Sequence, residues 1–186
     1  MPKLPLLTVD PKMTYLILSD SHGYGRRALE VLDRLSVINL SPQGIIFLGD
    51  GTRELLGRLG DISPVYAVLG NCDGFIDLYD SDGLIIPEER LEIFDGKRIL
   101  MLHGHRYSVK GGLSLAVKRA AELSADVLLF GHTHSPLCTT LPKGEQYGDV
   151  ILSRPLHVFN PGALMERSFG LLTIQNGEIL LSHGRV

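Results

Sequence analysis

Apolar and polar residues alternate along this chain in two ways. Short unbroken apolar runs are typical of strands buried on both faces, whereas apolar residues that recur every three or four positions indicate amphipathic helices. In the first half the two patterns follow each other in turn, which predicts parallel strands joined by crossover helices. The expected strands are 15–18, 44–48 and 65–69, and the expected helices are 26–35 and 52–59.

The second half carries two strong hairpin signals, Asp95-Gly96 and Asn176-Gly177, which suit two-residue turns between antiparallel strands. The runs that flank them are 90–94, 97–102, 171–174 and 178–181. A further helix is expected at 112–123, with strands at 125–130 and 156–159. Two packed sheets with helices outside would accommodate both halves, in a single domain of residues 1–186.

Two stretches lack such a pattern. Residues 74–87 are acidic and rich in turn residues, and we expect a surface loop over the strand ends. Residues 139–151 are polar and contain Gly and Pro, which is typical of a mobile loop. Both stretches are expected to determine which ligand fits.

Composition and charge narrow the range of partners. The formal net charge is -3 without a basic stripe, which argues against nucleic acid as a partner. No apolar stretch approaches the roughly 18 residues of a membrane span, and a signal-peptide pattern is lacking, so no membrane association is expected. The two cysteines, Cys72 and Cys138, form no C-x-x-C pair, which favours a reducing, cytoplasmic setting. Cys138 is expected to be a small packing residue.

Side chains that can bind metal ions follow the expected strands, mostly with glycine beside them. They are Asp20, His22, Asp50, Asn71, His103, His132 and His134. Taken one at a time, each is explained better as a turn residue, a helix cap or a surface histidine. Ligands bind at the carboxyl ends of strands in open α/β sheets, so jointly these residues favour a metal site. Asp20 and His22 would point the same way if the extended geometry continued past the strand.

The number and type of donors narrow the kind of metal site. Seven oxygen and nitrogen donors are too many for one tetrahedral zinc, and they suit two ions that share a carboxylate, about 3.5–4 Å apart. Imidazole, carboxylate and amide donors without a thiolate favour manganese, iron or zinc over copper(I). Because adjacent dications bind phosphoryl oxygens and acidify a bridging water, the predicted substrate is a small-molecule phosphate ester.

Five short motifs, taken together, resemble the calcineurin-like metallophosphoesterase superfamily. They are Asp20-Ser21-His22, Gly49-Asp50, Gly70-Asn71, His103-Gly104-His105 and Gly131-His132-Thr133-His134. The resemblance extends from Met13 to the region of Ile174. The chain length and Cys72-Asp73 are most similar to small bacterial and archaeal phosphodiesterases of the YfcE type. The fold this implies is α/β, a four-layer α/β/β/α sandwich of two mixed β-sheets flanked by helices.

The resemblance also implies an assignment of ligands. One ion would take Asp20, His22 and His134. The other would take Asn71, His103 and His132, with Asp50 bridging the two. Alternation along a strand would instead place His132 and His134 on the same ion. His105 is not a ligand in the family pattern and would line the site, touching the substrate or orienting a neighbour. Relatives often form homodimers or homotetramers, which makes self-association one expectation.

One position departs from the family pattern. Many relatives carry a histidine where this chain has Cys72, and that histidine assists the departing alcohol. A thiol is a poor proton donor to an alkoxide, and general acid catalysis is commonly worth about 10²–10⁴-fold in rate. Cys72 therefore predicts modest turnover, with a preference for esters of acidic alcohols.

The expected function is that of a phosphodiesterase in which a hydroxide that bridges two metal ions attacks phosphorus in line. A phosphomonoesterase on small phosphorylated metabolites is an alternative, which the missing histidine mildly disfavours. The same fold also serves without catalysis as a protein-interaction scaffold, in a retromer subunit that resembles these enzymes. Such scaffolds lose metal ligands, whereas every ligand position is filled here, and this favours an enzyme.

Overall fold

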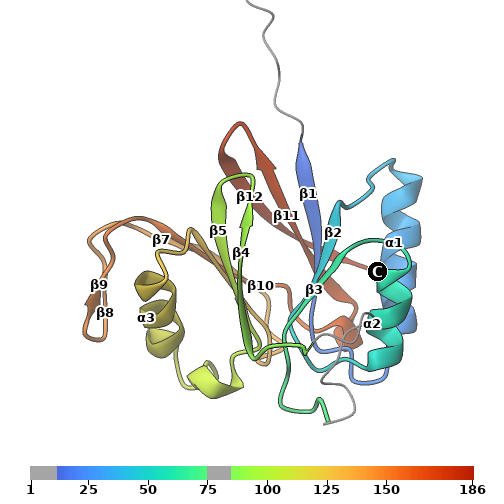
Figure 1. The fold of residues 1–186 in the computed structure, drawn as a ribbon, viewed down its shortest axis with the longest axis horizontal. Helices are drawn as coiled ribbons and strands as arrows, with labels where there is room; N and C mark the ends of the chain where they lie inside the picture. Colours follow the sequence, from blue (N-terminus) through green and yellow to red (C-terminus); the bar gives the residue numbers. More distant parts are fainter. Residues whose placement is uncertain (1–11, 75–84) are drawn as a thin grey trace, which may run out of the picture.

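The computed structural model describes residues 12–74 and 85–186, and it contains two five-stranded mixed sheets that pack face to face (Figure 1). The first sheet has the order β12-β11-β1-β2-β3. Its strands are β1 (Met13–Leu18), β2 (Gly44–Phe47), β3 (Val65–Ala67), β11 (Ser168–Gln175) and β12 (Glu178–Arg185). As predicted, β1, β2 and β3 are parallel, and β11 joins β1 in the antiparallel sense.

The second sheet has the order β4-β5-β6-β10-β7. Its strands are β4 (Glu89–Phe94), β5 (Lys97–Leu102), β6 (Val127–Phe130), β7 (Leu137–Leu141) and β10 (Leu156–Asn160). Here β5, β6 and β10 run parallel, and the edge strands β4 and β7 are antiparallel to their neighbours. Each sheet therefore presents several parallel strands whose carboxyl ends leave the sheet at the same edge.

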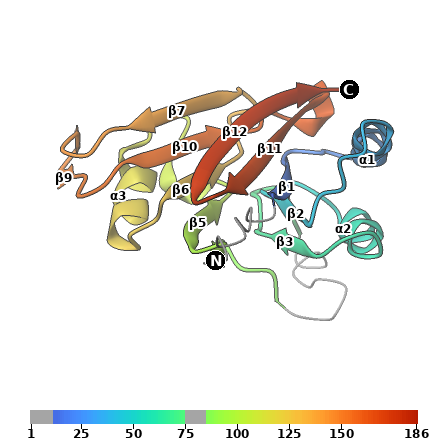
Figure 2. The same ribbon diagram turned by 90° about the horizontal axis from the view of Figure 1, so that it is seen from above.

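Helices cover the outer faces of both sheets (Figure 2). The first sheet carries α1 (Arg26–Val37) and α2 (Arg53–Gly60), and the second carries α3 (Ser114–Glu122). Thr52 caps α2, because its Oγ1 accepts a hydrogen bond from the backbone N–H of Leu55 at 3.2 Å. The four-layer α/β/β/α sandwich expected from the sequence is confirmed.

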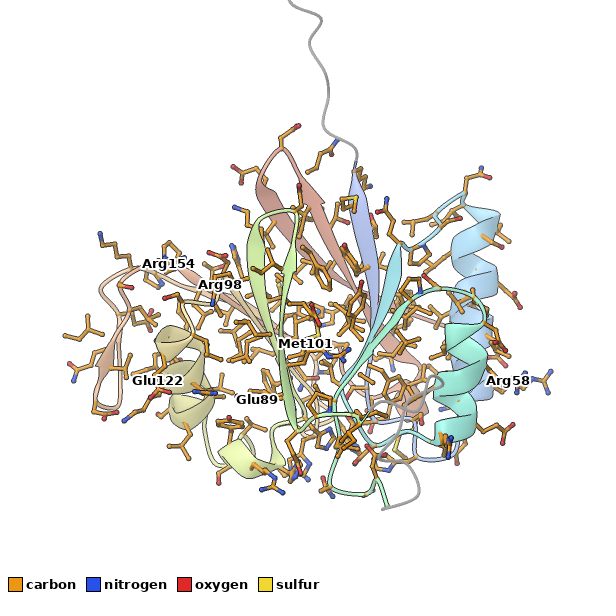
Figure 3. All side chains as sticks on the ribbon, in the orientation of Figure 1. Arg58, Glu89, Arg98, Met101, Glu122 and Arg154 are labelled. Carbon is orange, nitrogen blue, oxygen red and sulfur yellow. The ribbon has the colours of Figure 1, made fainter. Side chains whose placement is uncertain are left out.

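Three apolar layers follow from the alternation of side chains along the strands. On β1, Ile17 faces the space between the sheets, whereas Leu16 and Leu18 face α1 and α2. Met101, labelled in Figure 3, lies in the same inter-sheet layer as Ile17. Val117 of α3 belongs to the third layer, on the far side of the second sheet. Full burial of each such side chain contributes about 1.5–3 kcal/mol to the free energy of folding.

Both hairpin predictions are confirmed. Asp95-Gly96 and Asn176-Gly177 have positive φ angles at all four residues, 48°, 74°, 52° and 74°. Two consecutive positive φ angles are what a type I′ turn needs, and this turn matches the twist of the flanking strands. The second hairpin is longer than expected, because all eight residues of β11 pair with β12.

The prediction of a loop at 139–151 was wrong. The segment completes β7, which pairs with β10, and then forms a small hairpin of β8 (Gln146–Tyr147) and β9 (Val150–Ile151). The side chain of Lys118 binds the Asp149 carboxylate at 2.6 Å, so the hairpin lies against α3. Two-residue strands leave no readable periodicity, which is why the sequence pattern missed them. The other expected loop, 74–87, falls mostly on residues outside the described part of the chain.

None of the helices in the described ranges has the length and apolar character required to cross a bilayer.

Glycines at the strand ends allow the backbones of neighbouring loops to approach closely. A Cβ atom on Gly70 would lie 2.0 Å from Asp50 Oδ1 and 2.3 Å from the Asp50 backbone nitrogen. A Cβ atom on Gly131 would lie 2.0 Å from the hydroxyl oxygen of Ser19. Gly70 therefore lies directly against Asp50, and Gly131 lies directly against Ser19.

We expect Gly70→Ala to lower the free energy of unfolding by about 1–3 kcal/mol, because the added methyl group has no space. The matched control is Gly57→Ala in α2, where an added Cβ meets nothing within 4 Å. That variant should gain about 0.5–1 kcal/mol, since alanine favours a helix more than glycine does. Denaturant titrations of both variants and the wild type would measure the difference. Equal stability of the two variants would contradict the close packing at the strand ends.

Candidate metal centre

The carboxyl ends of β1 and β2 are joined directly by backbone hydrogen bonds. The N–H of Asp20 donates to the carbonyl of Gly49, and the N–H of Ser21 donates to the carbonyl of Asp50, both at 3.0 Å. Likewise, the N–H of Gly131 after β6 donates to the carbonyl of His103 after β5, at 3.0 Å. These bonds bring residues that are far apart in the sequence to one edge of the sandwich.

Five of the predicted ligands have left-handed backbone conformations. The φ angles are 54° at Asp20, 41° at His22, 57° at Asp50, 64° at His132 and 59° at His134. Such angles are uncommon for residues other than glycine and cost about 1–3 kcal/mol each. The extended geometry therefore does not continue past β1. The side chains of Asp20 and His22 still converge, with 3.7 Å between Oδ1 and Nε2, but a turn brings them together.

The carboxylate of Asp20 is fully buried at the centre of the cluster. Its Oδ2 accepts hydrogen bonds from the Ser19 hydroxyl and from the backbone N–H of His132. Its Oδ1 faces the Nε2 atoms of His134 at 3.2 Å, His22 at 3.7 Å and His103 at 4.0 Å. Within the described ranges this oxygen has no hydrogen-bond partner. A buried charged oxygen without a partner is costly, so the arrangement fits a cation held between these groups.

His103 presents a lone pair to the same space. Its Nδ1 lies 2.6 Å from the carbonyl oxygen of Leu48, which can only accept, so Nδ1 carries the proton. Its Nε2 then faces Asn71 Oδ1 at 3.1 Å and Asp50 Oδ2 at 3.5 Å. Three acceptor atoms that face one another repel unless a proton or a metal ion lies between them. A backbone carbonyl that fixes a histidine in this way is typical of metal sites.

Asp50 lies between two groups of histidines. Its Oδ2 is 3.4 Å from Nε2 of His22 and 3.5 Å from Nε2 of His103. Burial works to raise the pKa of Asp50, but the contacts with His103 and the N–H of Cys72 outweigh it and hold that pKa well below its usual range. Burial likewise works to lower the pKa of His103, and the facing carboxylates of Asp50 and Asp20 raise it on balance. Both shifts have the same main cause, the attraction between the Asp50 carboxylate and a positive charge on the facing His103 ring.

His132 and His134 face different parts of the cluster. The ring centroid of His134 lies 5.2 Å from that of His22, whereas the ring centroid of His132 lies 5.0 Å from that of His103. Period-two alternation would place both side chains on the same ion, but both residues have left-handed backbone conformations instead of strand geometry, and their rings lie beside different histidines. The grouping agrees with the family resemblance. The ion that each side chain binds remains a prediction.

His105 lies beside the cluster, at the start of the short 3-10 helix His105–Tyr107. Its ring centroid is 5.5 Å from that of His103 and 6.1 Å from that of His132. Glu88 Oε2 lies 3.7 Å from Nε2 of His105. Burial and the charge of His103 lower the pKa of His105, so a neutral ring is favoured there. His105 therefore lines one side of the centre, next to an acidic side chain.

The two cysteines differ in position, although both are exposed. Cys72 lies beside Asp50, and its backbone N–H donates to Asp50 Oδ1 at 2.8 Å. Cys138 lies in the edge strand β7, so its expected role as a packing residue was wrong. An edge strand leaves one side of the chain without a neighbour, which the sequence pattern around Cys138 did not reveal.

Two residues that position the cluster were missed from the sequence. The carboxylate of Asp73 accepts hydrogen bonds from the backbone N–H groups of Gly70 at 2.6 Å, Gly51 at 2.9 Å and Asp50 at 3.0 Å. It therefore ties the loop after β2 to the loop after β3. The fully buried Asn160 donates to the carbonyl of Gly131 at 2.9 Å. Asn160 is the last residue of β10, and Asp73 lies in the same loop after β3 as Asn71, so a position near a strand end was the available signal.

Among the residues that the structure describes, ligand atoms gather into three overlapping triads, and within each triad they lie no more than 4.8 Å from one another. The triads are Asp20-His22-His134, Asp20-Asp50-His103 and His22-Asp50-Cys72. Asp20, His22 and Asp50 each belong to two of them, so neighbouring positions for an ion share side chains. The donor types and their shared carboxylates fit divalent cations.

Comparison with known proteins gives consistent results. Residues 13–184 match the model of the calcineurin-like phosphoesterase superfamily domain. Probable metallophosphoesterase YsnB of Bacillus subtilis is 31% identical over 165 residues, which are 88% of this chain and 86% of that protein. Phosphodiesterase YfcE of Escherichia coli is 28% identical over 173 residues, which cover 86% of this chain and 87% of that protein.

The fold is also similar to solved structures. The structure of Vacuolar Protein Sorting 29 from Cryptosporidium parvum aligns with a TM-score of 0.69 at 18% identity and covers 95% of this chain and 99% of that one. At this identity the likeness concerns the fold alone. The family match spans nearly the whole chain, and the strand-end residues that it implies lie together in the structure. The chain therefore belongs to the calcineurin-like phosphoesterase superfamily, as does its relative YsnB, which is named as a probable metallophosphoesterase.

Proposed function

We propose that this protein is a phosphodiesterase that uses two divalent metal ions. The observation that carries the proposal is the buried Oδ1 of Asp20, which has no hydrogen-bond partner among the described residues and faces three imidazole nitrogens. Asp20, His22 and His134 would hold one ion. Asn71, His103 and His132 would hold the other, with Asp50 shared. Manganese, iron and zinc are the ions that suit these donors.

When bound, such ions supply positive charge for the phosphoryl oxygens and a water acidic enough to act as nucleophile on phosphorus. The protein's own part is to hold its donors rigidly. The carbonyl of Leu48 keeps His103 in one tautomer, and Ser19 fixes the carboxylate plane of Asp20. Asp73 holds the backbone of Asp50. Donors that are already in place need not reorganise during the reaction, which is how a preorganised site lowers the barrier.

Diesters are preferred over monoesters in this proposal because of Cys72. Its thiol is surrounded by carboxylates, and burial together with the charge of Asp50 raises its pKa. The group is therefore a poor donor of a proton to a departing alkoxide, and substrates with acidic alcohols need no such donor. The similarity to YfcE, which is named as a phosphodiesterase, supports this choice.

The alternative of a non-catalytic scaffold is supported only by the similarity of fold to Vacuolar Protein Sorting 29. All seven expected ligand positions carry donor side chains, which favours the enzyme. Activity of the metal-free protein reloaded with manganese, iron or zinc in turn, against an aryl diester and an aryl monoester, decides between the functions. Hydrolysis of the diester supports the proposal, hydrolysis of the monoester alone favours the phosphomonoesterase, and activity with neither supports the scaffold.

Asp50→Asn is expected to weaken binding of both ions by at least about 10–100-fold and to abolish diester hydrolysis. The variant removes the shared negative charge but keeps an oxygen that can accept from the N–H of Cys72. Calorimetric titration with manganese and the hydrolysis rate would measure the two effects. Asp33→Asn is the control, because Asp33 is exposed on α1. Two tightly bound ions and full activity in Asp50→Asn would show that the ligand assignment is wrong.

Cys72→His is expected to raise kcat for diesters of poorly acidic alcohols by as much as about 10²–10⁴-fold, because an imidazolium can donate the proton that the thiol does not. Aryl diesters should gain much less, since their alcohols leave unaided. Rates with paired alkyl and aryl diesters would measure the contrast, with Cys138→His as the control. An unchanged ratio of the two rates would contradict the role given to this position.

A further inference from the structure

The sulfur atom of Cys72 is not among the metal ligands assigned above. Its Sγ, a ring nitrogen of His22 and a carboxylate oxygen of Asp50 all lie within 4.8 Å of one another. Ligand atoms around one ion of this kind are held at about 2.0–2.3 Å from the metal, so two of them lie at most about 4.6 Å apart, which is close to the upper limit for this triad. His22 and Asp50 are already proposed as ligands, and the sulfur is thus a third donor at the same position.

The backbone and a neighbouring amide hold this sulfur in place. The N–H of Cys72 donates to Asp50 Oδ1 at 2.8 Å, and this contact fixes the turn that carries the side chain. The amide nitrogen of Asn71 donates to the sulfur at 3.2 Å. The oxygen of the same amide faces Nε2 of His103, so one end of Asn71 points into the cluster and the other supports the sulfur. An N–H group that donates to sulfur favours a sulfur that carries negative charge.

Cys72 would bind as a thiolate. The S–H bond would break, a metal–sulfur bond would form, and the proton would pass to solvent. The same dication would compensate the carboxylate of Asp50, which has an oxygen within 4.8 Å of the sulfur.

We propose that Cys72 is a thiolate ligand of the ion held by His22 and Asp50. This rests on the metal centre of the proposed function and changes the ion that the centre selects. Thiolates are soft donors and prefer zinc to manganese, so the sulfur shifts the selectivity of the centre toward zinc. A centre with histidine in place of Cys72 has no sulfur donor at this position.

Cobalt(II), a spectroscopic substitute for zinc, tests the proposal without an activity assay. Its visible bands report that the ion is bound, and a separate near-ultraviolet band reports a bond to thiolate. We expect both in wild-type protein and in Cys138→Ser, the matched control. Cys72→Ser should keep the visible bands and lose the near-ultraviolet band. The side chain of Cys72 is exposed, so this substitution should leave the fold intact.

A competition between zinc and manganese gives a second measurement. Cys72→Ser should lower the ratio of zinc affinity to manganese affinity by at least about tenfold. Visible bands without a thiolate band in the wild type would overturn the inference and leave the two-metal phosphodiesterase intact. Failure of the wild type to bind cobalt(II) or zinc at all would overturn both.

Discussion

Burial of two carboxylates at one point is the constraint on which the rest of the centre depends. Asp20 is fully buried and Asp50 is 3% exposed, and both face His22 and His103 within 4.0 Å. Removing an ionised carboxylate from water is expensive unless opposite charge or hydrogen bonds compensate for it. Protonated imidazoles could supply part of that charge, and divalent cations supply more of it in less space. Burying these carboxylates together is thus unfavourable in free energy without cations and favourable with cations bound.

The sandwich holds the buried carboxylates in place because the ends of its strands are bonded directly to one another. Backbone hydrogen bonds join the ends of neighbouring strands, and glycines let those backbones approach closely. Asp73 and Asn160 then tie each loop to the next through their side chains. The strain of the left-handed residues is tolerated because the surrounding contacts leave them no alternative. Such a frame can keep ligand atoms close together even though like charges repel.

Membership of the superfamily sets the class of chemistry, while single residues adjust it. The relatives named as metallophosphoesterases share the domain, and Vacuolar Protein Sorting 29 shares the fold. Cys72 lies where the centre meets solvent, and in the proposals above it would affect two properties, the supply of a proton to the departing alcohol and the softness of the donor set. His105 and Glu88 line the neighbouring side of the centre, next to His132.

The sequence by itself determined the layers, the hairpins and the residues at the strand ends, because periodicity and turn chemistry are local properties. It also listed the candidate ligands, since each lies within a few residues of the end of an apolar run. Only the tertiary structure decided how they face one another. Left-handed turns at His132 and His134 override the alternation of a strand, and Asp73 acts through backbone groups of other loops. Contacts between residues distant in the chain leave no local pattern. The strands β8 and β9 within 139–151 were missed for another reason, because two residues are too few to show a periodicity.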